Sequence, residues 1–134
     1  MSVFIDSGIF VGAVNIADSN HARAKELMEK ITRGELGTAF TSDYVVDETI
    51  TAVLARTRKF RLAVEVGEFI LSSPRIKKVY VNTNIFQSAW GQFKSLRKPM
   101  SFTDYTTLAL LGKYDIETLA SFDSEFDGLV KRIW

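Results

Sequence analysis

Two aspartates in this chain stand directly after short apolar segments that are typical of buried strands. Asp6 follows VFI (3–5), and Asp123 follows TLASF (118–122). In α/β sheets, ligands bind beyond the carboxyl ends of the strands, so both carboxylates are candidates for chemistry. Each aspartate alone is also explained as a turn or helix-capping residue, because Asp readily bonds to nearby backbone.

Two further acids lie near the starts of predicted helices. In SFTDYTTLALL, Asp104 has Leu108 and Leu111 four and seven residues later, so it shares a helical stripe with apolar side chains. Ser101 stands three residues before Asp104, which is also the spacing of a capping box. In SDYVVDETITAVL, helical spacing places Glu48 near the apolar side, although a solvated helix face explains it equally well.

The chemistry that such acids share is the binding of a hard cation. Clustered carboxylates repel one another, so one or more of them must either take up a proton or share a positive ion. Oxygen ligands favour Mg²⁺ or Mn²⁺. Zinc is disfavoured, because the chain has no cysteine and a single histidine, His21.

The stretch SFDSEFD (121–127) carries two more acids, Glu125 and Asp127, close to Asp123. They rank behind Asp123, because they do not follow the strand directly. We expect them to be solvated or to act only through water. Phe122 and Phe126 are expected to anchor this turn in the core.

The elements that position these acids alternate along the chain. Short apolar segments interleaved with amphipathic helices predict an α/β protein with a parallel sheet and right-handed crossovers. Strands are expected at 3–5, 37–40, 76–81, 118–122 and 130–134. Helices are expected from about 18 to 33, 42 to 58, 60 to 71, 101 to 112, and from 82 or 83 to the basic loop KSLRKPM (94–100).

Composition narrows the class of protein. The 134 residues predict a single domain over 1–134. Seventeen basic and sixteen acidic residues give a net charge of +1, so nucleic-acid binding would have to come from local patches. No apolar run approaches the length of about 20 residues that a membrane span needs. The start MSVFIDSG lacks the features of a signal peptide, so a cytoplasmic protein is expected.

Taken in order, FIDSG, TSDYVVDETIT, SFTDYTTLALL and LASFDSEFDG resemble the PIN-domain family over nearly the whole chain. The pattern looks most like the compact VapC-type ribonuclease toxins of toxin–antitoxin pairs. The resemblance implies a three-layer α/β/α PIN-like fold and metal-dependent cleavage of RNA, often tRNA. It carries over an acidic quartet of Asp6, Glu48, Asp104 and Asp123.

The resemblance also implies supporting roles. Ser7 and Ser121 occupy the small hydroxyl positions beside the strand-end aspartates, Glu125 stands where a further acid is common, and Asp127 could hold an outer-shell water. The expected mechanism is phosphodiester hydrolysis, in which Mg²⁺ or Mn²⁺ lowers the pKa of a bound water and neutralises developing charge. Three quartet aspartates would hold the ion, with Glu48 binding it directly or through water.

Backbone phosphates of RNA would need cations near the acids. The favoured candidates are Lys94, Arg97 and Lys98, because the basic loop leads directly into the Asp104 helix. A second set lies between the two central helices, at Arg56, Arg58, Lys59 and Arg61. For any single residue of either set, a solvated surface charge is the more common explanation.

By family analogy alone, the chain should have an antitoxin protein as partner and form a homodimer, with the helices near 44–70 as the candidate interface. Two alternatives share the fold: a PIN nuclease of RNA processing that is not a toxin, and a catalytically inactive PIN-like module that binds RNA or protein. A dehalogenase-like phosphatase is disfavoured, because Gly8 stands where its second aspartate is needed.

Overall fold

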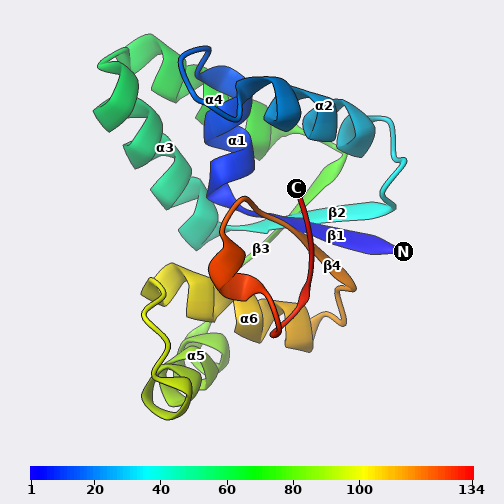
Figure 1. Ribbon diagram of the computed structural model, residues 1–134, viewed down its shortest axis with the longest axis vertical. Coiled ribbons are helices and arrows are strands. Elements are labelled where there is room, and N and C mark those ends of the chain that lie inside the picture. Colours follow the sequence, from blue (N-terminus) through cyan, green and yellow to red (C-terminus); the bar gives the residue numbers. More distant parts are fainter.

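The computed structural model describes all residues from 1 to 134, and a five-stranded sheet lies at its centre (Figure 1). All pairings in the sheet are parallel, and the strand order is β3-β2-β1-β4-β5. The strands are β1 (Ser2–Ile5), β2 (Thr38–Ser42), β3 (Ile76–Val79), β4 (Thr118–Ala120) and β5 (Lys131–Ile133). The predicted parallel α/β architecture is therefore confirmed.

The strand order reverses between β1 and β4. The chain steps outward from β1 to β2 and β3, then returns to place β4 on the other side of β1. Such a reversal leaves a crevice beyond the carboxyl ends of the two central strands, which is where open α/β sheets bind ligands. Ile5 pairs with Ala120, so the next residues, Asp6 and Ser121, leave the sheet at the same level.

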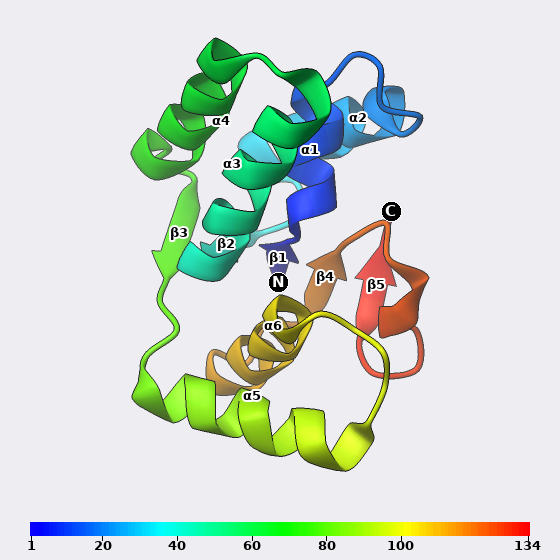
Figure 2. The same cartoon turned by 90° about the vertical axis from the view of Figure 1, so that its left-hand side faces the viewer.

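Six helices cover the two faces of the sheet and complete three layers (Figures 1 and 2). On one face lie α1 (Ser7–Val14), α2 (His21–Thr32), α3 (Asp43–Thr57) and α4 (Phe60–Ser72). On the other lie α5 (Thr83–Leu96) and α6 (Phe102–Lys113). The core between the layers is apolar, and β1 is buried on both sides, as a central parallel strand should be.

Helix α1 is the one α-helix that the sequence did not predict. The segment SGIFVGAV is apolar on almost every side, so it shows no helical periodicity. The preceding Asp6 and Ser7 also look like turn residues. In the structure Asp6 is the N-cap of α1, which confirms the helix-capping alternative for this residue. The strand therefore passes directly into a buried helix.

Two local expectations about α5 were wrong. Helical spacing along this segment predicts that Phe86, Trp90 and Phe93 face inward with Ile85 and Ala89, but each of the three is at least 39% exposed, and only Ile85 and Ala89 are buried. The reason is that α5 packs mainly on α6 and needs only a narrow apolar stripe to do so (Figure 2). The expected basic loop also begins later, because 94–96 still belong to the helix.

No helix is both long enough and apolar enough to cross a membrane.

Candidate active site

A cavity of about 480 Å³ opens at the carboxyl edge of the sheet, and all four acids of the quartet line it. Asp6 and Asp123 come from the ends of the central strands, Glu48 from α3 and Asp104 from α6. The acids are 19 to 117 residues apart in the chain, and the reversal in strand order brings them together. The fold thus places these four side chains around one cavity, as expected from the sequence.

Asp6 is the most tightly held of the four. Its Oδ1 accepts a hydrogen bond of 2.8 Å from the backbone N–H of Ser7, and its Oδ2 accepts one of 2.6 Å from the Ser121 hydroxyl. The residue is only 6% exposed. Burial raises the pKa of Asp6 to about 6, because it disfavours the charged form more than these two hydrogen bonds favour it. Repulsion from Glu48 and Asp123 adds to the rise in this pKa.

Asp104 lies in the first turn of α6 and is 7% exposed. Its backbone N–H donates to the hydroxyl of Ser101, the N-cap residue, at 3.1 Å. The capping interpretation is therefore confirmed for Ser101, and Asp104 also lines the cavity. Burial, followed by repulsion from Asp6 and the other two quartet acids, raises the pKa of Asp104 to about 7.

Glu48 reaches the cavity from the second turn of α3. Ser42 is the N-cap of this helix, and its hydroxyl accepts from the N–H of Val45 at 3.1 Å. The Glu48 carboxylate accepts a hydrogen bond of 2.5 Å from the hydroxyl of Ser7. Asp47, its neighbour, is exposed. The sequence left the orientation of Glu48 open, and the fold turns it toward the acids.

Ser121 links the two strand-end aspartates. Its hydroxyl donates to Asp6 and accepts from the backbone N–H of Asp123 at 3.0 Å. Asp123 in turn accepts from the N–H of Glu125 at 2.9 Å, which caps the short helix η1 (Ser124–Phe126). One small hydroxyl therefore fixes the position of Asp123 relative to Asp6.

A family model described as PIN domain matches residues 3–131. The chain belongs to the PIN domain family. It is 27% identical over 128 residues to a VapC ribonuclease of Archaeoglobus fulgidus, an alignment that covers 94% of this chain and 80% of that protein. It is also 27% identical over 125 residues to the 23S rRNA-specific endonuclease VapC20 of Mycobacterium tuberculosis, covering 92% and 91%.

Solved structures share this PIN fold. The crystal structure of Mycobacterium tuberculosis VapC20, a sarcin–ricin loop cleaving toxin, matches with a TM-score of 0.83 and 26% identity over 95% of this chain and 94% of that one. VapBC2 of Rickettsia felis, bound to a promoter DNA fragment, matches with a TM-score of 0.70 and 13% identity over 99% and 98%. The second likeness shows the fold alone.

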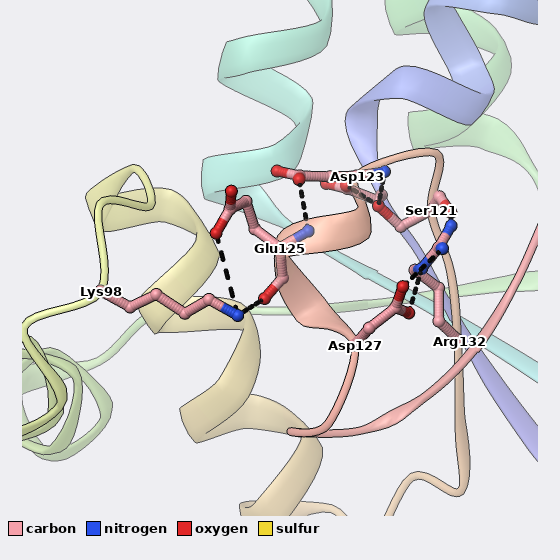
Figure 3. Close-up of polar contacts among 7 residues, drawn as sticks. Lys98, Ser121, Asp123, Glu125, Asp127 and Arg132 are labelled. Atoms are coloured by element: carbon pink, nitrogen blue, oxygen red, sulfur yellow. Dashed lines mark hydrogen bonds and ion pairs between the residues drawn. The ribbon is translucent and has the colours of Figure 1, made fainter.

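Glu125 and Asp127 lie outside the cavity of this PIN domain and have cationic partners (Figure 3). Glu125 contacts Lys98, whose ammonium also donates to the Glu125 carbonyl oxygen. Asp127 accepts two hydrogen bonds from Arg132, at 2.7 and 3.0 Å. Both acids are therefore neutralised by neighbours, which separates them from the quartet.

Arg132, on β5, is a residue that the sequence did not single out. Besides Asp127, its guanidinium donates to the carbonyl oxygen of Ser121 at 3.1 Å and stacks on the ring of Trp134, 3.8 Å from the centroid. It is 6% exposed at the side chain. Only the pairing of β5 with β4 brings it to this place, and no local pattern signals it.

The basic residues favoured for RNA contacts do not line the cavity. Lys94, Arg97 and Lys98 lie outside it, and the one cation in its lining is Arg56. Asp18 and Asn20, from the loop between α1 and α2, also line it and were not predicted. Polar residues in a loop outside any motif could not be identified as site residues from the sequence.

The donor set of the cavity fits a hard divalent cation in its chemistry, because it offers several carboxylate oxygens and no thiolate or imidazole. Burial, together with repulsion among the acids, raises the pKa values of Asp6 and Asp104. No three acidic or imidazole groups converge closely enough in the structure to hold an ion. Binding one would therefore require side-chain movement within the quartet.

Proposed function

We propose that this PIN domain is an endoribonuclease that hydrolyses RNA phosphodiester bonds with Mg²⁺ or Mn²⁺ bound among Asp6, Glu48, Asp104 and Asp123. The observation that carries the proposal is the crowding of these uncompensated carboxylates around one open cavity at the strand-order reversal. The names of the similar proteins, a VapC ribonuclease and an rRNA endonuclease, support the same activity.

The chain's own residues would prepare this site for the reaction. When bound, the cation would activate a water and stabilise negative charge on the phosphate. Ser121 and the Ser7 amide orient Asp6, and the Ser7 hydroxyl orients Glu48. Burial and repulsion from the other acids raise the pKa of Asp104 to about 7 in the metal-free site, and a bound cation would hold this carboxylate ionised.

The printed names of two similar proteins suggest the substrate class. VapC20 acts on 23S rRNA, and its crystal structure is described as that of a toxin cleaving the sarcin–ricin loop. We therefore place structured ribosomal RNA ahead of the tRNA that the family resemblance suggests. Incubation of the protein with intact ribosomes, isolated 23S rRNA and total tRNA would separate these substrates by the appearance of a discrete product.

The chain would act as the toxin of a toxin–antitoxin pair, with a cognate antitoxin protein and as a homodimer. Several exposed apolar side chains on α4 support a protein-binding surface, because a solvated helix rarely presents so many. They are Phe60, Val64, Phe69 and Leu71. Measurement of the mass in solution would test the dimer, and growth arrest on expression, relieved by a neighbouring gene product, would test the toxin.

The decisive experiment compares RNA cleavage with Mn²⁺, with EDTA, and by an Asp6→Asn variant. Cleavage should require the added metal and should disappear in the variant. Activity that survives both the chelator and the substitution would show that the proposed metal–carboxylate mechanism is wrong. Asp127→Asn is the matched control, because Asp127 is an acid of the same region that lies outside the cavity.

A further inference from the structure

The side chains that line the cavity carry far more negative than positive charge. Five carboxylates border it, namely those of Asp18 and the quartet, and they face a single cation, Arg56. RNA carries one negative charge per nucleotide, and proteins hold such chains mainly through Lys and Arg contacts to phosphates. A polyanion that enters this cavity therefore meets one side chain that can attract it.

Arg56 is placed to make such a contact. It lies in the last turn of α3, and its side chain is 60% exposed. Its Nη1 is 3.9 Å from Oδ2 of Asp18, which is the outer limit of an ion pair. The remaining N–H groups of the guanidinium fork have no acceptor in the protein, so they remain available to an incoming anion.

Asp18 is a fixed partner rather than a mobile one. Its side chain is 15% exposed, and its Oδ1 accepts a hydrogen bond of 2.8 Å from the N–H of Asn20. The carboxylate thus holds the guanidinium at the cavity wall through one long contact. An anion that offers two oxygens to the fork would bind it better than this contact does.

The distance along α3 decides which phosphate Arg56 can reach. It follows Glu48 by eight residues, which corresponds to about 12 Å along the helix axis. Glu48 belongs to the proposed cleavage centre, so this separation favours contact with a phosphate beside the cleaved bond over contact with the bond itself. A neighbouring phosphate of the same strand is within its range.

We infer that Arg56 binds a substrate RNA phosphate next to the cleaved bond, and that Asp18 occupies the guanidinium until RNA replaces it. This inference rests on the proposed ribonuclease function and assigns the substrate contact of that same site. Lys98, by contrast, is already committed to Glu125. Arg56 would set the affinity and register of the RNA, while the quartet performs the chemistry.

The test measures RNA binding separately from cleavage. All variants are made in an Asp6→Asn background, and the probe is a labelled hairpin with the sarcin–ricin loop sequence beside a single-stranded RNA of mixed sequence. Arg56→Gln should weaken binding about tenfold and reduce the slope of log K against log salt by about 0.7, the loss of one phosphate contact. Arg56→Lys should be intermediate, because it keeps the charge and loses the fork.

Two further variants make the inference falsifiable. Asp18→Asn should tighten binding about threefold, because it removes a competing charge while its amide oxygen still accepts from Asn20. Arg33→Gln is the matched control, since Arg33 is an exposed cation outside the cavity that pairs with Glu29 and Glu35, and it should leave binding unchanged. Equal affinities for Arg56→Gln and Arg33→Gln, or an unchanged salt slope in Arg56→Gln, would overturn the inference.

The cleavage assay keeps this result apart from the proposed function. In the otherwise unaltered protein, Arg56→Gln should raise KM and change kcat little. Absence of cleavage by the wild type on every RNA would refute the ribonuclease proposal. Normal cleavage with an unchanged KM in Arg56→Gln would refute the role of Arg56 alone.

Discussion

Two groups of carboxylates lie at the carboxyl edge of the sheet, and they differ in what surrounds them. Asp6 and Asp104 are buried among other acids, and their pKa values rise to about 6 and about 7. Asp127 accepts two hydrogen bonds from Arg132, which holds its pKa below the usual value. Asp123, four residues before Asp127, belongs with the first group, because it lines the cavity.

The two groups differ in their effect on stability. A carboxylate that pairs with a cation is stabilised in its charged form and adds to the stability of the fold. Carboxylates that repel one another in a buried site lower stability at neutral pH, and such sites are common where a protein binds a cation or performs catalysis. Variants of one group can therefore be compared directly with variants of the other.

The largest expected effect is on catalysis. Asp6→Asn or Asp104→Asn should reduce RNA cleavage by about 10²-fold or more, because each removes a charge from the proposed metal site. Asp127→Asn should retain most of the activity. Initial cleavage rates in Mn²⁺ would measure this, and equal losses in all three variants would abolish the distinction between the two groups.

Substitution of Asp104, which should lower activity, should raise the free energy of unfolding. The native pKa of Asp104 is raised to about 7, so between about pH 4 and pH 7 the folded protein binds more protons than the unfolded chain. Its contribution to stability is therefore lost as the pH rises through this window. Asp104→Asn should raise the free energy of unfolding by a few kcal/mol at most at pH 8, and by little at pH 4.

Urea titrations at the two pH values, without divalent metal, would measure this difference. Asp127→Asn provides the reference, and it should show no gain at pH 8, because Asp127 is stabilised in its charged form. A loss of stability in Asp104→Asn at pH 8 would mean that the quartet charge is compensated in a way the structure does not show.

A bound divalent cation should offset the negative charge of the quartet and so raise thermal stability. Mn²⁺ or Mg²⁺ in excess should raise the Tm of the wild type by several degrees, because an ion that binds only the folded state stabilises it. The shift should shrink in Asp6→Asn and stay unchanged in Asp127→Asn. Thermal melts at pH 8, with EDTA as the baseline, provide the measurement, and an equal shift in both variants would place the ion elsewhere.

Removal of the cationic partner of the second group, in Arg132→Met, should lower Tm by several degrees. The substitution leaves Asp127 without its partner, and it removes the bond to the Ser121 carbonyl oxygen and the stacking on Trp134. Ser121 also holds Asp6 and the backbone of Asp123, so cleavage should fall as well. Asp127→Asn should lower Tm less, since it spares the contacts to Ser121 and Trp134.

The smallest effect is expected at the exposed pair of Lys98 and Glu125. Ion pairs of this kind contribute about 0.5 kcal/mol or less. Glu125→Gln should therefore change Tm by less than the Arg132 variant does and should leave cleavage intact. A large loss of activity in Glu125→Gln would move this residue from the second group into the first.

Much of the site could be predicted from local patterns. An apolar segment followed by an acid identified Asp6 and Asp123, and helical spacing placed Asp104 on an inward face. Helix α1 escaped prediction because its residues are apolar all round, which removes the periodic signal. The orientation of Glu48 was undecided, because a helix start with acids on adjacent positions fits both a solvated and a buried face.

The sequence by itself determined the alternation of strands and helices, the acids that end the central strands, and the absence of thiolate or multiple imidazole ligands. Only the tertiary structure decided which carboxylates are neutralised. Arg132 pairs with Asp127 and Arg56 meets Asp18 across loops and strand pairings that no local pattern encodes. The physical reason is that a carboxylate's pKa depends on burial and on charges nearby in space, and the strand order sets both.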